Sequence, residues 1–128
     1  MKKASDMVAE ANALVDHAPA KDMLALHGQA GVTFVDLRDP RELERDGMIP
    51  GACHCPRGML EFWIDPDSPY HKPVFNQDKT YVFYCASAWR SALSARVAME
   101  MGLSPVLHLE GGFTKWVEEG GPVVPRDS

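Results

Sequence analysis

Residues 81–92 read YVFYCASAWRSA, and this stretch decides how the chain can fold. Its first four residues are aromatic or β-branched, which is typical of a buried β-strand. From about residue 90, Leu93, Val97 and Met101 repeat at helical spacing until Gly102 ends the helix. A strand that leads into a helix within a few residues is the unit from which α/β domains are built.

Working outward, we expect further strands on both sides of this unit. Residues 32–35 form a buried apolar run that ends at Asp36, residues 106–109 form another, and residues 52–55 form a shorter candidate. Between the strands, residues 57–78 are rich in proline and aromatic residues without a clear period. That composition predicts an ordered loop with a single helical turn near residues 58–63.

Helices are expected between the strands. An amphipathic helix is predicted over residues 5–16, a short one from Pro19 to Gly28, one from Asp39-Pro40 to Gly47, and a last one around residues 113–117. Strands that alternate with helices predict an α/β domain whose mostly parallel sheet is covered by helices on both faces.

Composition and charge limit the function. At 128 residues and 45% hydrophobic residues, the chain fits one globular domain. Its net charge of −5 argues against nucleic-acid binding, and no segment is long and apolar enough to span a membrane. Three cysteines are too few for the disulfide framework of a small secreted domain. We therefore expect a cytoplasmic protein with free thiols.

In a parallel sheet the functional crevice lies beyond the carboxyl ends of the strands. Four segments follow strands in this way, namely residues 36–38, 56–58, 85–90 and 110–112. Cys85 stands out because the tight turn after it points backbone N–H groups inward and the next helix adds its positive dipole end, which favours a thiolate nucleophile. The alternative is a buried structural cysteine, which is a common setting for a free thiol.

Four segments resemble the motifs of the rhodanese family, in family order. They read VDLRDPREL at residues 35–43, GMIPGA at 47–52, YCASAWRSA at 84–92 and LEGGFTKW at 109–116, closed by GGPV at 120–123. The resemblance implies a five-stranded rhodanese fold over residues 17–126, with residues 1–16 as a helical extension. It also implies a sulfurtransferase that needs no cofactor or metal and carries sulfur as a persulfide on Cys85.

By the same resemblance, the active loop continues through Ala86, Ser87, Ala88, Trp89 and Arg90, supported by Asp36, Arg38 and Glu42. Arg57 is added as a supporting residue because it follows a strand at the same end of the sheet. Arg90 has two candidate roles, binding the sulfonate end of thiosulfate or fixing the loop by pairing with Asp36 or Glu42, and we favour the second. Trp89 is expected either to shield the mouth of the pocket or to pack on the loop at residues 57–72, and we favour packing. Arg57 and Lys72 are candidates for positive charge at the rim.

Two positions depart from the family motifs. Ala88 stands where the family has glycine, so a left-handed backbone there would cost about 1 kcal/mol. Met48 stands where the family has histidine, which removes a proton donor that sulfur transfer through a thiolate does not obviously need.

Other candidate ligands are interpreted as structural. Cys53 and Cys55 lack the second ligand pair of a typical metal site, so we expect small core residues, with a resolving thiol as the minor alternative. The histidines at positions 17, 27 and 108 are expected to have structural roles.

Two rival functions remain. Phosphatases and arsenate reductases of this fold use a longer C-x5-R loop, whereas this chain has C-x4-R, which suits a sulfur atom better than a phosphate. A non-catalytic binding or sensing module is the other rival, although Cys85 is present. Expected partners are a small sulfur donor, such as thiosulfate or a persulfide, and an acceptor such as cyanide, a thiol or a sulfur-carrier protein; the sequence leaves the oligomeric state open.

Overall fold

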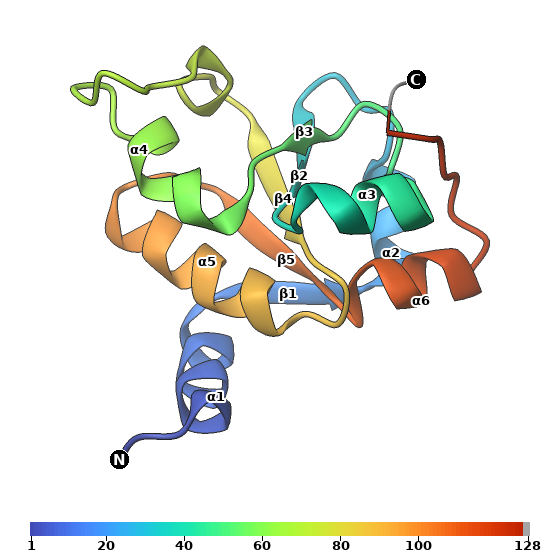
Figure 1. The fold of residues 1–128 in the computed structure, drawn as a ribbon, viewed down its shortest axis with the longest axis horizontal. Helices are drawn as coiled ribbons and strands as arrows, with labels where there is room; N and C mark the ends of the chain where they lie inside the picture. The colour runs from blue at the N-terminus through green and yellow to red at the C-terminus, as the bar shows by residue number, and fades with distance from the viewer. Residues whose placement is uncertain (127–128) are drawn as a thin grey trace.

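The computed structural model describes residues 1–126 and contains a five-stranded sheet in the order β1-β5-β4-β2-β3 (Figure 1). All neighbouring strands run parallel, as the sequence predicts. β4 (Thr80–Tyr84) is central, between β2 (Val32–Asp36) and β5 (Val106–Glu110). The edge strands are β1 (Asp16–Pro19) and β3 (Cys53–His54).

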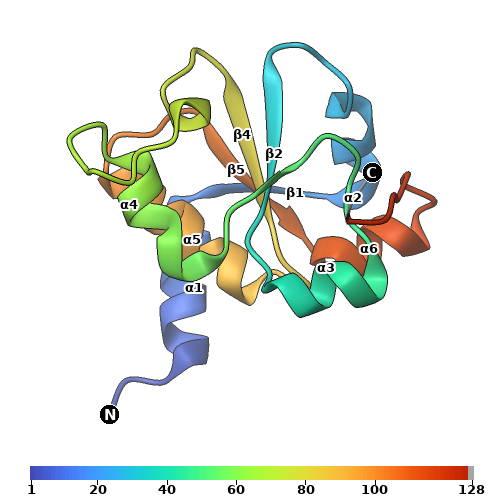
Figure 2. The same cartoon turned by 45° about the horizontal axis from the view of Figure 1, so that its top comes forward.

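Helices cover both faces of the sheet, which confirms the predicted layers (Figure 2). α4 (Leu60–Ile64) and α5 (Trp89–Glu100) lie on one face, and α1 (Ala4–Leu14) packs against α5. α2 (Ala20–Met23), α3 (Pro40–Asp46) and α6 (Gly112–Glu118) lie on the other side. Short 3-10 turns occupy Leu24–Leu26, Arg57–Met59 and Pro73–Phe75.

The central strand builds a core on each face because its side chains alternate between them. Tyr81 and Phe83 pack with α4 and α5, whereas Val82 and Tyr84 pack with α2 and α6. All four side chains are fully buried. A strand buried on both faces has the continuous apolar pattern seen at 81–84.

The first strand was not predicted from the residue pattern. Residues 16–19 pair with β5 only, and their side chains are exposed or half-buried, so they show no apolar alternation. The amino-terminal helix therefore ends at Leu14, before residue 16. Pro19 is the last strand residue and precedes α2, so its expected place as the first helical residue is wrong.

The segment after β3 contains the helical turn predicted near residues 58–63, as the 3-10 turn at Arg57–Met59 followed by α4. β3 spans two residues, shorter than the expected strand at 52–55, because it pairs with β2 over two residues at the sheet edge. Within the expected loop at 57–78, α4 inserts Leu60 and Ile64 into the core, which gives this segment a helix of its own. Among the described residues 1–126, no helix has the length and apolarity that crossing a membrane requires.

Candidate active site

Cys85 lies at the middle of the carboxyl edge of the sheet. It directly follows Tyr84, the last residue of the central strand, and the neighbouring strands end nearby at Asp36 and Glu110. Because all strands are parallel, the four segments predicted to follow strand ends do meet at this edge. The thiol is 1% exposed, so the loop closes around it.

The loop after Cys85 turns its backbone toward the sulfur. Ala88 adopts the left-handed conformation at φ 94° and is the residue that precedes α5. In this conformation its N–H donates to Cys85 Sγ at 3.1 Å, and the positive end of the α5 dipole lies beside the same atom. An N–H donor and a helix amino terminus beside the sulfur atom are the setting in which proteins stabilise a thiolate.

α6 fixes the loop from the opposite side. The N–H groups of Phe113 and Thr114 donate to the carbonyl oxygens of Cys85, at 2.7 Å, and Ala86, at 3.2 Å. Gly112 makes this approach feasible, because a Cβ there would lie 2.4 Å from the Cys85 carbonyl oxygen. The glycine at position 112 is therefore a requirement of backbone packing against the active loop.

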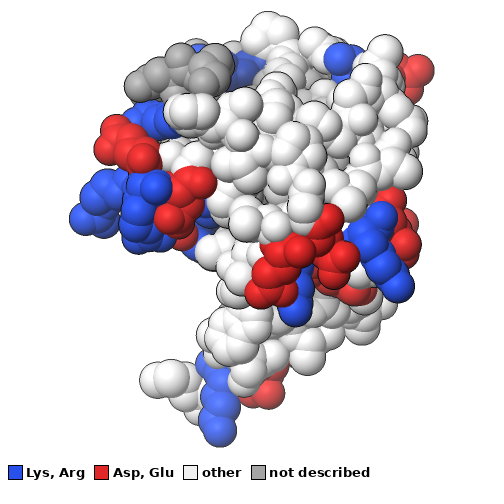
Figure 3. Space-filling model, turned by 90° about the vertical axis from the view of Figure 1, so that its right-hand side faces the viewer, with Lys and Arg blue, Asp and Glu red and all other residues white. Residues whose placement is uncertain are grey.

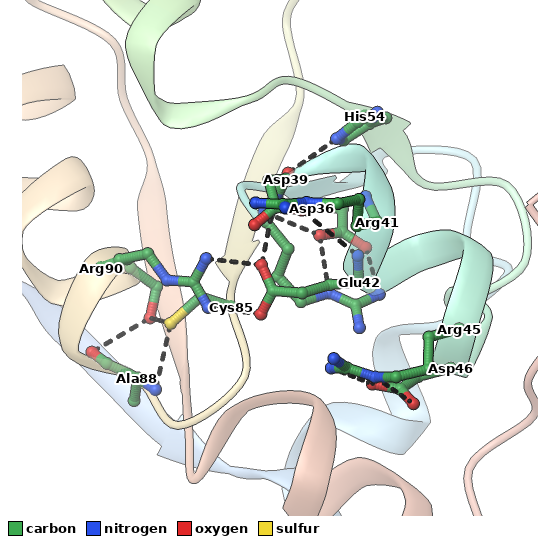
Figure 4. Close-up of polar contacts among 12 residues, drawn as sticks. Asp36, Asp39, Arg41, Glu42, Arg45, Asp46, His54, Cys85, Ala88 and Arg90 are labelled. Carbon is green, nitrogen blue, oxygen red and sulfur yellow. Dashed lines mark hydrogen bonds and ion pairs between the residues drawn. The ribbon is translucent and has the colours of Figure 1, made fainter.

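Arg90 closes the loop through a bidentate ion pair with Glu42 of α3 (Figure 4). Both N–O distances are 2.8 Å, and Glu42 Oε2 also accepts the N–H of Asp39 as part of the helix cap. The Arg90 guanidinium lowers the pKa of Glu42 to about 2. Of the two partners expected for Arg90, the structure has Glu42 and not Asp36.

Comparison with known proteins identifies a matching family model and related sequences. The family model for the rhodanese-like domain matches residues 19–119. A sulfurtransferase from Allochromatium vinosum is 33% identical over 93 residues, which cover 73% of this chain and 78% of the relative. The putative sulfurtransferase YtwF of Bacillus subtilis is 34% identical over 70% of this chain and 77% of its own.

The chain belongs to the rhodanese-like family.

Solved structures agree with this assignment of a rhodanese-like domain. A protein of unknown function from Rhodopseudomonas palustris, described as a possible tyrosine phosphatase, superposes with a TM-score of 0.95 at 54% identity, covering 97% of this chain and 96% of that one. The polysulfide-sulfur transferase homodimer of Wolinella succinogenes gives a TM-score of 0.70 at 31% identity, covering 93% and 85%.

The two departures from the rhodanese motifs have different structural consequences. Ala88 does adopt the left-handed backbone that glycine tolerates better, so the conditional expectation of about 1 kcal/mol of strain applies. Met48 is buried and its backbone forms an antiparallel bridge with Val124. In this rhodanese-like domain, position 48 therefore lies where the carboxyl-terminal segment is fastened to the fold.

Asp36 and Arg38 pair with each other. The guanidinium donates to the Asp36 carboxylate at 2.7 and 3.0 Å and to the Gly47 carbonyl oxygen at 2.8 Å, and both side chains are buried. The Arg38 guanidinium also lies 4.2 Å from the centre of the Phe113 ring. The pair thus connects β2 with the end of α3 and with α6, the helix that holds the active loop.

The remaining side chains expected around the active loop are those of Arg57, Lys72 and Trp89. Arg57 pairs with Glu61 at 2.8 Å, and Lys72 lies over the Trp63 ring at 5.1 Å. Trp89 is 53% exposed and, with Ser87, lines a pocket of about 320 Å³ whose other wall comes from α1, β1 and β5. Trp89 thus contributes to a pocket on the α1 side of the loop.

Cys53 and Cys55 are free thiols in the sheet edge and its following turn. Burial raises the pKa of both thiols, to about 12 for Cys55. Cys55 is a core residue, as expected, whereas Cys53 is half-buried. Within residues 1–126, no three His, Cys, Asp or Glu side chains are grouped so as to hold a metal ion.

The structure adds residues to the site that sequence reasoning missed. The Ser91 hydroxyl lies 3.7 Å from Cys85 Sγ and 3.2 Å from Nδ1 of His108, and Nε2 of the same ring lies 2.6 Å from Asn12 Oδ1. His108 lies within an apolar strand and was interpreted as structural. His108 lies 23 residues after Cys85, too far along the chain for a local sequence pattern to link them. Its place beside the active loop becomes apparent only from the pairing of β4 with β5.

Proposed function

We propose that this protein transfers sulfane sulfur through a persulfide on Cys85. In the first half-reaction, the Cys85 sulfur attacks the outer sulfur of thiosulfate; the new sulfur–sulfur bond forms as that of thiosulfate breaks, and sulfite leaves with the electron pair. In the second half-reaction, a thiophilic acceptor such as cyanide or a thiol attacks the terminal sulfur, and Cys85 leaves as the thiolate. A small-molecule persulfide is an equivalent donor.

The observation that carries this proposal is the N–H of Ala88 at 3.1 Å from Cys85 Sγ, inside a loop closed by Arg90 and α6. Preorganised N–H donors and a helix dipole stabilise a thiolate and the persulfide anion formed from it. The Arg90 guanidinium is engaged by Glu42 while its charge also acts on Cys85, so the Ala88 N–H is the direct donor to sulfur in the loop. The sulfurtransferase relatives and the polysulfide-sulfur transferase structure support a sulfur-transfer function in general.

The partners of this reaction are a small sulfur donor and a small acceptor, with a sulfur-carrier protein as the macromolecular alternative for the acceptor. We assign the protein to the cytoplasm because its three free cysteines suit a reducing compartment.

Intact mass spectrometry after incubation with thiosulfate tests the proposal. We expect one added sulfur atom that cyanide or a thiol removes, and no addition to Cys85→Ser. Cys53→Ser and Cys55→Ser are the matched controls and should load normally, because burial disfavours their thiolates. Sulfur found on Cys53 or Cys55 with Cys85 unmodified contradicts the site. If neither thiosulfate nor a persulfide loads any thiol, the binding-module function is favoured instead.

The description of the Rhodopseudomonas palustris structure as a possible tyrosine phosphatase makes phosphatase activity the second candidate. The C-x4-R spacing is one residue shorter than the phosphatase loop, and the Arg90 fork is held by Glu42 rather than left for a phosphate. We therefore expect no turnover of p-nitrophenyl phosphate above background. Hydrolysis that disappears in Cys85→Ser would overturn the sulfurtransferase proposal.

A further inference from the structure

A chain of hydrogen bonds runs from the active thiol into the amino-terminal helix. Cys85 Sγ contacts Ser91 Oγ at 3.7 Å, Ser91 Oγ contacts His108 Nδ1 at 3.2 Å, and His108 Nε2 contacts Asn12 Oδ1 at 2.6 Å. Ser91 and His108 are almost completely buried, so water competes little for these contacts. The chain joins four elements, because its members follow β4 or lie in α5, β5 and α1.

The last contact fixes where the hydrogens lie. The amide oxygen of Asn12 only accepts, so Nε2 of His108 carries the hydrogen and the Nδ1 of the neutral ring is an acceptor. The Ser91 hydroxyl can then donate to Nδ1 while its oxygen accepts the hydrogen of the Cys85 thiol. The Ser91 hydroxyl also lies 3.2 Å from the Ala88 carbonyl oxygen, so it has two acceptors, that carbonyl and Nδ1 of His108. When it donates to Nδ1, every donor in the chain points away from Cys85 and toward α1.

We propose that His108, acting through the Ser91 hydroxyl, takes up the proton that Cys85 releases, and that Asn12 of α1 holds the ring in the tautomer able to accept it. The thiol proton moves to Ser91 Oγ while the Ser91 hydroxyl proton moves to Nδ1, which leaves a sulfur anion and an imidazolium. The proton returns when the acceptor has removed the sulfur. This role rests on the proposed function, and it makes His108 and Asn12 positioning residues.

The charges around the ring are consistent with this role. Burial, together with the His17 ring centred 5.5 Å away, lowers the pKa of His108 to about 4, and Glu110 opposes them. The ring is therefore neutral and a weak base at pH 7, so it takes the proton only as negative charge develops on Cys85. Negative charge arising on Cys85 favours the imidazolium, so the proton is held only while sulfur carries that charge.

The contact of Asn12 with His108 gives α1 a role in the proposed proton transfer. The family model begins at residue 19, so Asn12 lies outside the matched domain. Val8 and Ala11 of α1 pack on Ala92 of α5, one residue beyond Ser91, which anchors the helix beside the chain. The extension would thus complete the proton path of the catalytic domain.

Four variants test the role, each checked for an unchanged fold by circular dichroism. His108→Asn keeps an oxygen acceptor near the position of Nδ1 but cannot take a proton, and Ser91→Ala interrupts the chain. Asn12→Asp should hold the imidazolium more strongly through Nε2. Ala13→Asp adds the same charge at an exposed position of α1 and is the matched control.

Two rates and one spectrum are measured. Alkylation of Cys85 by iodoacetamide at pH 7 reports nucleophilicity without sulfur transfer, and thiosulfate loading reports the proposed reaction. We expect both rates to fall on the order of 10²-fold in His108→Asn and Ser91→Ala. In ¹⁵N NMR, the His108 titration midpoint should rise above about pH 7 when Cys85 is loaded. It should also rise, by about 1–3 pH units, in Asn12→Asp but not in Ala13→Asp.

The proton-holding role is overturned if the alkylation rate is unchanged in His108→Asn and Ser91→Ala. It is also overturned if the titration midpoint of His108 changes neither when Cys85 is loaded nor in Asn12→Asp. Failure of thiosulfate and persulfide loading in the unaltered protein counts against the proposed function instead. The alkylation rates and the midpoint in Asn12→Asp still test the chain in that case.

Discussion

Individual residues around Cys85 divide between those that face sulfur and those that hold the loop. Ala88 contributes a backbone N–H at the expense of a left-handed conformation, and Ser91 contributes a hydroxyl. Arg90 faces Glu42, so its charge is satisfied within the protein. We infer that Arg90 acts by fixing the loop on α3, which is the role favoured from the sequence.

The Arg90–Glu42 pair predicts a pH dependence of stability. The folded-state pKa of Glu42 is about 2, below its usual value of 4.5, so the stabilisation is complete above about pH 4.5 and is lost as the pH falls toward 2. Glu42→Gln should lower the free energy of unfolding at pH 7 by about 1–2 kcal/mol. This value is reduced for solvent screening, because the Arg90 side chain is 40% exposed. The difference in stability between the variant and the unaltered protein should shrink between about pH 5 and pH 2.

Denaturant unfolding at several pH values measures this difference. Glu44→Gln is the control, because Glu44 belongs to an exposed pair with Arg126 and should change stability by less than about 0.5 kcal/mol. A Glu42→Gln deficit that is the same at pH 7 and pH 2 would rule out the ion pair as its cause.

At the scale of elements, three helices and a strand meet at one loop. α5 starts at the loop, α6 donates N–H groups to its carbonyls, and α3 holds its arginine. The buried Asp36–Arg38 pair ties α3 to β2 and lies against α6. The loop is therefore fixed on two sides by elements far apart in the sequence.

The contact between α6 and the loop predicts a steric effect at Gly112. Gly112→Ala places a Cβ 2.4 Å from the Cys85 carbonyl oxygen at φ +58°, so α6 must move and its two N–H bonds to the loop lengthen. We expect a loss of about 2–4 kcal/mol in the free energy of unfolding and slower sulfur loading.

Gly120→Ala provides the comparison for this prediction. Gly120 also has a positive φ, +79°, but its Cβ would meet nothing within 4 Å. It should cost about 1 kcal/mol and leave loading unchanged. Equal effects of the two substitutions would mean that backbone strain, and not the approach to Cys85, accounts for Gly112.

The whole molecule has a surface of mixed charge around cores on both faces of the sheet. Figure 3 shows one face on which acidic and basic side chains lie next to one another around a largely uncharged surface. α1 stands apart from the two main cores, because its buried residues Val8 and Ala11 form a small cluster with Ala92. We therefore keep residues 1–16 as an extension and residues 17–126 as the domain, as a proposal that unfolding experiments test.

Ala11→Glu tests that division, because it puts a charge at a fully buried contact between α1 and α5. We expect α1 amides to lose hydrogen-exchange protection while β4 amides keep theirs, and thiosulfate loading to slow as Asn12 withdraws. Ala13→Glu, at an exposed position, should change neither. Equal loss of protection in α1 and β4 would instead make α1 part of one cooperative unit.

The sequence by itself determined the alternation of buried strands and helices, and with it a parallel sheet and the edge where Cys85 lies. These features depend on local apolar periodicity and on glycine and proline signals, which are read within a few residues. It also placed Cys85 at a strand-to-helix turn and named Glu42 as one partner for Arg90.

Only the tertiary structure decided which distant groups meet. β1 has no apolar alternation and forms because β5 offers a free edge. The choice of Glu42 over Asp36 depends on where α3 packs, and the contact of His108 with Ser91 depends on the pairing of β4 with β5. Such contacts join residues 17 to 96 positions apart, and their geometry is set by strand order and helix packing rather than by any local pattern.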